Sequence, residues 1–187
     1  ARSELQSVAE AYLENKEPAK ANEIYRSLLR RYPEADEYHI ALAEVLEKTG
    51  QGARAIERRL VLHEIYQKSD RPVEMVANLK AALQIDPEQA NLHRILGEVL
   101  VDLGNYREAV EHLLLAAGAA MQEQDRLTAV QCYRQVIGID ESHLEAHQRF
   151  HQLQSGCTLN EEEKKELLEV RLRLLRLLAE DRPEATG

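Results

Sequence analysis

An internal repeat is the feature of this sequence that most constrains its fold. Residues 36–89 align without a gap on residues 90–143, so each position recurs 54 positions later. The stretch LAEVLEKTGQGARA, which begins at Leu42, returns as LGEVLVDLGNYREA from Leu96, and residues 1–35 match the last part of the same unit. A short unit cannot bury its apolar side chains alone, so a core has to form between neighbouring copies. The repeat therefore predicts a stack of similar units over residues 1–143.

The spacing of apolar residues within each unit is helical. These residues recur every three or four positions, and Gly50, Pro72 and Pro87 interrupt the pattern at regular places. Ala, Leu, Glu, Gln and Arg dominate the composition, while Trp is absent and Phe occurs once, which disfavours a β-sandwich or barrel. The sequence therefore predicts an all-α fold of about ten antiparallel helices. We place them at about residues 3–16, 18–31, 36–49, 53–68, 72–85, 90–103, 106–122, 126–138, 143–155 and 160–180.

The last of these helices differs in kind from the others. Leucine and valine cover more than half of its circumference, so it has to bury most of its surface. Thr158 followed by Glu161 fits a capping box at its start. We therefore expect helical repeats over 1–157, a capping helix over 158–181 that packs against the end of the stack, and a tail over 182–187. The alternative is a docking or self-association helix.

One stretch of the repeat resembles a known family. The pattern LGxxLxxxGxYxxA, from Leu96 to Ala109, is similar to the signature of the tetratricopeptide repeat, a 34-residue helix-turn-helix. Copies in the same register begin near positions 2, 36, 56, 90 and 110, so long and short intervals alternate between their starts. The period of 54 is thus a pair of overlapping motifs, which share the helices at 53–68 and 106–122. The resemblance implies an α-solenoid.

The resemblance also implies where a partner binds. Proteins of this family hold an extended peptide or a helix on a concave face that the first helix of each repeat lines. Glu10, Glu44 and Glu98 share one repeat position, so they would form a row of carboxylates that selects ligands bearing Lys or Arg. The alternative is that Glu is simply a solvated helix former at these positions. The implied groove residues are Gln6, Glu10, Leu13, Glu14, Glu37, Ile40, Glu44, Glu47, Lys48, Asn91, Arg94, Glu98, Val101 and Asp102.

Composition narrows the classes of partner and compartment. A formal net charge of −9 disfavours binding to nucleic acid, because neutralising phosphates requires clustered Lys and Arg. A membrane span is not expected, because the sequence lacks a run of about 18 uncharged apolar residues. Cys132 and Cys157 are too few for a disulfide framework, which favours a cytoplasmic protein with reduced thiols. Because the first residues, ARSELQ, lack an initiator Met, we expect a fragment or a processed product.

Motifs for catalysis and for cofactors are missing from the sequence. It has no Gly-rich phosphate loop, no HExxH and no GxSxG, so we expect neither an enzyme nor a bound cofactor. Cys132 falls within the apolar pattern of its helix, which indicates a buried, inert thiol. Three histidines on one helical face, near Cys157, have the spacing of a zinc or nickel site: His143, His147 and His151. The recurrence of His39 as His93 and His147, at the period of the repeat, indicates packing residues instead.

These observations together predict a non-catalytic interaction scaffold or adaptor. We expect it to bind a peptide or helix of a protein partner, with basic residues, in an acidic concave groove. Two alternatives remain at this point. One is structural self-assembly, with homo-oligomers formed through residues 160–180, and the other is a metal-binding sensor that uses the histidine face.

Overall fold

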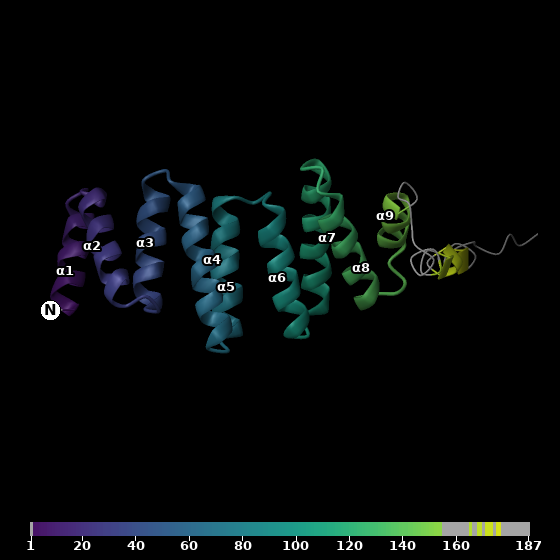
Figure 1. Cartoon of the computed structure of the whole chain (residues 1–187), viewed down its shortest axis with the longest axis horizontal. Coiled ribbons are helices and arrows are strands. Elements are labelled where there is room, and N and C mark those ends of the chain that lie inside the picture. Colours follow the sequence, from purple (N-terminus) through teal and green to yellow (C-terminus); the bar gives the residue numbers. More distant parts are fainter. Residues whose placement is uncertain (1, 155–164, 166–167, 170, 174, 177–187) are drawn as a thin grey trace, which may run out of the picture. The chain divides into compact units, whose positions relative to one another are not determined.

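The fold is all-α in the part of the chain that the structure describes. This computed structural model describes residues 2–154 and, further on, residues 165, 168–169, 171–173 and 175–176. Residues 2–154 form nine helices and no strand (Figure 1). They are α1 (Arg2–Glu14), α2 (Pro18–Arg31), α3 (Asp36–Lys48), α4 (Gly52–Lys68), α5 (Pro72–Ile85), α6 (Ala90–Asp102), α7 (Tyr106–Gln122), α8 (Arg126–Ile139) and α9 (Leu144–Gln154).

The helices follow the period of the sequence. The pair α3 and α6 have 13 residues each, α4 and α7 have 17, and α5 and α8 have 14, like α2. The second member of each of these three pairs begins one full period after the first. Pro18 and Pro72 stand at the first positions of α2 and α5, where a missing backbone N–H costs no helical hydrogen bond. The all-α repeat fold expected from the sequence is confirmed.

The expected capping helix at 158–181 falls largely outside the described residues, as do its capping box and the tail at 182–187. The few residues of this segment that are described are helical, and the side chains of Leu168, Leu172 and Leu175 are exposed. Capping of the stack and self-association through residues 160–180 both stay predictions.

The chain divides into two compact units, 1–87 and 88–187. In unit 1, helices α1 to α5 pack in order as antiparallel neighbours, and α4 lies against both α3 and α5. In unit 2, helices α6 to α9 pack in the same manner, and α7 lies against both α6 and α8. The two helices that belong to overlapping motifs, α4 and α7, are therefore the middle helices of three-helix groups.

The core of unit 1 combines small and aromatic side chains. Ala9, Ala21 and Ala55 have no exposed surface, and their size lets the helix backbones approach closely. Tyr38 fills the space between α2 and α3, where its ring centroid lies 6.5 Å from that of Tyr25. Complete burial of a large apolar side chain stabilises a fold by about 1.5–3 kcal/mol. Stacked neighbours therefore supply the core that one helix pair lacks.

The core of unit 2 depends on the close approach of α6 and α7. A Cβ atom added to Gly97 would lie 2.8 Å from Leu113 Cγ and 3.4 Å from the backbone oxygen of Ala109. Ala117 on α7 is fully buried, and Phe150 brings α9 into the same cluster. The small residues of the repeat signature thus set the distance between the helices.

Helices end at turns that also repeat. Gly50 and Gly104 have φ angles of 73° and 74°, and Lys16, Asp70 and Gln124 have φ angles of 59°, 52° and 63°. Both sets recur with the period of the sequence. The backbone N–H of Asn105 donates to the carbonyl of Leu100 at 2.9 Å, which closes the end of α6. The positive φ angles at these turns correspond to the left-handed conformation. Glycine adopts this conformation readily, whereas residues other than Gly, Asn and Asp adopt it at a cost in free energy.

We expect Gln124→Gly to raise the free energy of unfolding by about 0.5–1 kcal/mol, because glycine removes the strain of a positive φ at the end of α7. Gly104→Ala is the matched opposite, and we expect it to lower the free energy by about 1 kcal/mol, although its Cβ would meet no atom within 4 Å. Urea denaturation followed by circular dichroism measures both. A loss of stability in Gln124→Gly would contradict the strain argument.

Candidate functional site

The implied groove residues lie on three helices of the two units. Those on α1 and α3 belong to unit 1, and those on α6 belong to unit 2. Every one of them is exposed or half-buried, so their side chains are at the surface of their unit. The half-buried ones are Gln6, Leu13, Ile40, Arg94, Glu98 and Val101, and the exposed ones are Glu10, Glu14, Glu37, Glu44, Glu47, Lys48, Asn91 and Asp102.

Two of the carboxylates in unit 1 act on the same buried tyrosine. Burial raises the pKa of Tyr25, and the negative charges of Glu10 on α1 and Glu44 on α3 raise it further. Two carboxylates from different helices thus act electrostatically on one buried tyrosine. Gln6 donates a hydrogen bond of 3.1 Å to Glu10 Oε1 from one turn earlier on α1. The surface of α1 and α3 beside Tyr25 is called the α1–α3 face below.

Glu47, also on α3, pairs with a residue of α4 instead. Its Oε2 lies 3.7 Å from Nη2 of Arg59, whose side chain is buried on α4. The pairing draws Glu47 towards α4, because the buried guanidinium requires a negative partner.

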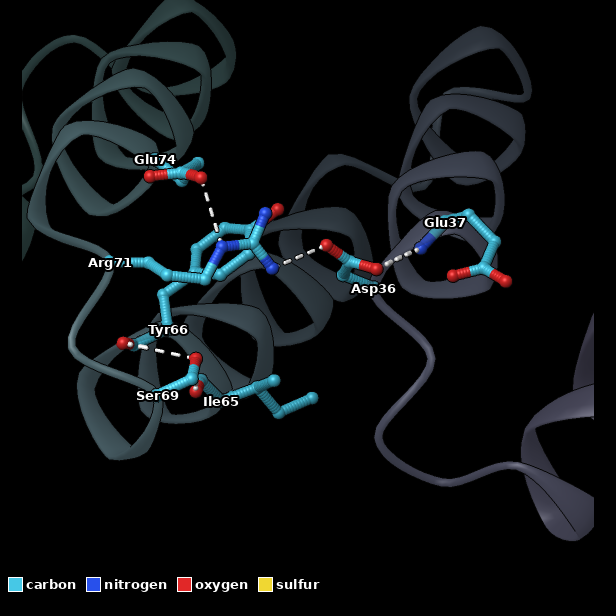
Figure 2. Close-up of polar contacts among 7 residues, drawn as sticks. All are labelled: Asp36, Glu37, Ile65, Tyr66, Ser69, Arg71 and Glu74. Atoms are coloured by element: carbon cyan, nitrogen blue, oxygen red, sulfur yellow. Dashed lines mark hydrogen bonds and ion pairs between the residues drawn. The ribbon is translucent and has the colours of Figure 1, made fainter.

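A second polar cluster in unit 1 joins α3 to α5. Figure 2 shows Arg71, just before α5, between the carboxylates of Asp36 and Glu74. Its Nη1 donates to Asp36 Oδ2 at 2.8 Å, its Nε donates to Glu74 Oε1 at 2.9 Å, and its Cζ lies 4.6 Å from the centre of the Tyr66 ring. The bonds from Arg71 lower the pKa of both carboxyl groups. Because Arg71 engages both carboxylates, the cluster fixes the start of α5.

A cavity of about 440 Å³ opens on the surface of unit 2. Three of the implied groove residues, Glu98, Val101 and Asp102, form the wall from α6. Tyr106 at the start of α7 and residues near the end of α8 complete it: Gln135, Gly138 and Ile139. The helices α6 and α8 lie on either side of the cavity because both pack against α7. The structure thus brings an acidic, an aliphatic and an aromatic surface together.

Glu98 is held in place by its neighbours. Arg94 Nη1 donates to Glu98 Oε1 at 2.7 Å, and Gln135 Nε2 reaches the same oxygen at 3.3 Å from α8. A further hydrogen bond of 2.9 Å joins Arg94 Nη2 to Asn91 Oδ1. Both bonds to Glu98 fall on one of its two oxygens, so the carboxylate is oriented and keeps acceptor capacity. The row of carboxylates expected from the sequence therefore carries less free charge at Glu98 than at Glu10 or Glu44.

Sequence reasoning missed the four cavity residues outside α6. Tyr106 stands where the preceding copy has Gly52, and Gly138 stands where it has Gln84. A comparison of the two copies position by position could have singled out both. Nothing in the sequence shows that α6 and α8 share a cavity, because their approach depends on how both helices pack against α7.

Two of the repeated histidines, His39 and His147, serve packing. The ring Nε2 of His39 donates to the carbonyl of Pro33 at 2.7 Å, and that of His147 donates to the carbonyl of Glu141 at 2.9 Å. Within the described residues no group of three His, Cys, Asp or Glu side chains could hold a metal ion, and Cys157 lies outside them. The packing interpretation of the repeated histidines is confirmed for His39 and His147.

Cys132 on α8 is fully buried, as expected from the sequence, and burial raises the pKa of its thiol to about 11. At neutral pH the thiol is therefore protonated and a poor nucleophile. Among the helices that the structure describes, none has both the length and the apolar character of a membrane span.

Comparison with known proteins points to one family. Family models described as "Tetratricopeptide repeat" match residues 2–45 and residues 76–138. No curated protein matches the chain significantly. Among solved structures, a thermophilic TPR protein of Thermus thermophilus is 18% identical, with 82% of this chain and 98% of that chain covered and a TM-score of 0.31.

Two further solved structures are similar over most of the chain. MamA is 16% identical, with 92% and 95% of the two chains covered and a TM-score of 0.30. The Pseudomonas aeruginosa protein pilF is also 16% identical, with 98% of this chain and 77% of that chain covered and a TM-score of 0.30.

Proposed function

Because the chain belongs to the tetratricopeptide repeat family, whose members are in general non-catalytic scaffolds that bind other proteins, we propose that it binds a basic segment of a protein partner. The α1–α3 face of unit 1 and the cavity side of unit 2 are the binding surfaces. Both carry residues at the groove positions of the family, and both are acidic.

The observation that carries this proposal is the pairing of Glu10 and Glu44 around Tyr25. Two carboxylates from different helices act on one buried hydroxyl, and burial leaves the tyrosine neutral at physiological pH. Glu10 and Glu44 themselves are exposed, so a ligand can reach them. Both carboxylates are negatively charged, so their combined field favours Lys- and Arg-bearing segments over acidic ones.

Charge reversal at the α1–α3 face tests the proposal. We expect the full chain to bind fluorescein-labelled peptides rich in Lys and Arg more tightly than Glu-rich peptides of equal length. Glu10→Lys combined with Glu44→Lys should weaken the binding of basic peptides about tenfold, which corresponds to about 1.4 kcal/mol. Fluorescence anisotropy at low and at physiological salt measures this, and the preference should shrink as salt screens the charges.

A matched control keeps the same change in net charge. Glu23 on α2 and Glu57 on α4 are exposed residues of the same unit. Glu23→Lys combined with Glu57→Lys should leave binding within about twofold of the unaltered chain, because these positions lie outside the α1–α3 face. Equal losses in both double variants would show a non-specific charge effect and would refute the α1–α3 face as the site.

A further inference from the structure

The two complete copies of the repeat differ at the cavity of unit 2. Glu98 and Ile139 have the same residue types as Glu44 and Ile85, which stand one period earlier. The other five cavity positions change. Val101 replaces Glu47, Asp102 replaces Lys48, Tyr106 replaces Gly52, Gln135 replaces Ala81, and Gly138 replaces Gln84.

The first copy has no room for the corresponding aromatic side chain. A Cβ atom added to Gly52 would lie 2.9 Å from Ile85 Cγ2. In the second copy Tyr106 is 55% exposed, and a Cβ atom added to Gly138 would meet nothing within 4 Å. The second copy therefore accommodates an aromatic side chain at a place where the first copy does not. Beside it, a glutamate and a lysine of the first copy are replaced by Val101 and Asp102.

The surface of this cavity has three chemical parts. Val101 and Ile139 are aliphatic, partly buried residues that pack on the core of unit 2. Tyr106 offers an aromatic ring at the entrance, and Glu98 and Asp102 stand one helical turn apart on α6. No described side chain forms an ion pair with Asp102, whereas Glu98 shares its charge with Arg94. The cavity is thus anionic on one side and apolar on the other.

We propose that this cavity is a subsite for one arginine side chain of the bound segment. The inference rests on the proposed function, because it assigns one residue of the basic partner to one place on unit 2. The methylene stem of arginine packs against Val101 and Ile139. Its guanidinium lies over the Tyr106 ring and donates to Asp102 and to Glu98.

The chemistry of the wall selects arginine over other side chains. Two carboxylates exclude Asp and Glu, and a purely apolar side chain would leave Asp102 without a partner. Lysine satisfies the charge, but its ammonium group lacks the planar surface that stacks on an aromatic ring and the fork that matches a carboxylate. We therefore expect the order arginine, then lysine, then citrulline and norleucine, the last two of which carry no charge.

Nuclear magnetic resonance on the full chain tests this order. The probes are the blocked amino acids N-acetyl-arginine methylamide and its lysine, citrulline and norleucine counterparts. The arginine probe should shift the methyl signals of Val101 and Ile139 and the amide signal of Gly138, with an affinity about tenfold above that of the citrulline probe. Equal shifts from arginine and citrulline would overturn the proposal, as would equal affinities of arginine and lysine.

Two variants and one control localise the effect. Gly138→Gln places the side chain of the first copy into the cavity and should abolish the shifts, while Asp102→Asn should weaken arginine binding about tenfold. Gly118→Gln on α7 is the matched control, since a Cβ atom there also meets nothing within 4 Å and Gly118 lies outside this cavity. Binding that survives Gly138→Gln, or that is lost equally in Gly118→Gln, would refute the subsite.

These outcomes separate the subsite from the general function. If arginine binds no better than citrulline while Glu10→Lys with Glu44→Lys still weakens basic peptides, the subsite is wrong and the scaffold function stands. If the chain shows no preference for basic peptides at all, the proposed function itself fails.

Discussion

Replacing Phe150 by alanine should lower the free energy of unfolding of unit 2 by about 3–5 kcal/mol. Phe150 is 1% exposed, and it is the largest side chain by which α9 enters the core of this unit. Removing its ring leaves a cavity among Ala146, Tyr133 and their neighbours, which are too small or too fixed to fill it. Urea denaturation of the full chain, followed by circular dichroism, measures the loss.

A neighbouring position on α9 supplies the control. Gln148 is exposed, and Gln148→Ala should change stability by less than about 0.5 kcal/mol. Phe150→Leu keeps most of the apolar volume, so it should cost clearly less than the alanine variant. If Phe150→Ala were no more costly than Gln148→Ala, α9 would not be part of the folded core.

Replacing Leu113 by alanine should lower the free energy of unfolding by about 2–5 kcal/mol, because Leu113 has no exposed surface. Gly97→Ala alone should cost about 1–3 kcal/mol, since its Cβ would lie 2.8 Å from Leu113 Cγ. When both substitutions are present, the alanine at position 113 removes the side chain that the new Cβ meets. The cost of the double variant should then fall short of the sum of the two single costs by about 1 kcal/mol.

The two single variants and the double variant form a double-mutant cycle, whose outcome can contradict this prediction. Strict additivity would show that Gly97 and Leu113 do not limit each other, and that the glycine is required for another reason. Gly118→Ala is a useful reference on α7, because its Cβ meets nothing within 4 Å. Alanine forms helices better than glycine, so this variant should stabilise the chain by about 0.5–1 kcal/mol.

The helices could be predicted from the sequence because their signals are local. The starts of α2 and α5 follow from Pro18 and Pro72, and the ends of α3 and α6 precede Gly50 and Gly104 closely. The expected spans of α2, α5 and α7 agree with the structure at both ends, and those of the other helices up to α9 differ by no more than two residues at either end. The division of the chain into two units could not be predicted this way, because the repeat runs past Pro87 without a change in pattern.

The candidate site could be predicted only in part. The resemblance to the repeat family pointed to Glu98, Val101 and Asp102, which line the cavity. It also pointed to Glu10 and Glu44, whose negative charges both raise the pKa of Tyr25. It also selected Glu47, which pairs with Arg59 instead. Repeat position specifies the face of a helix, but the partner of a charged side chain depends on three-dimensional neighbours. For the same reason the contribution of α8 to the cavity was not predictable.

The grouping of three helices per period determines the directions of the helices that a bound segment would contact in unit 1. Successive helices alternate in direction, so two helices that are three positions apart run in opposite directions. Helix α4 is sequence-equivalent to α1 and runs opposite to it, and α5 runs opposite to its equivalent α2. Helices α1 and α3 are two steps apart and run in parallel. If the α1–α3 face binds an extended segment as proposed, a segment of defined N-to-C polarity would meet Glu10 and Glu44 on helices of the same direction. It would meet Glu64, which stands one period after Glu10, on a helix of the opposite direction.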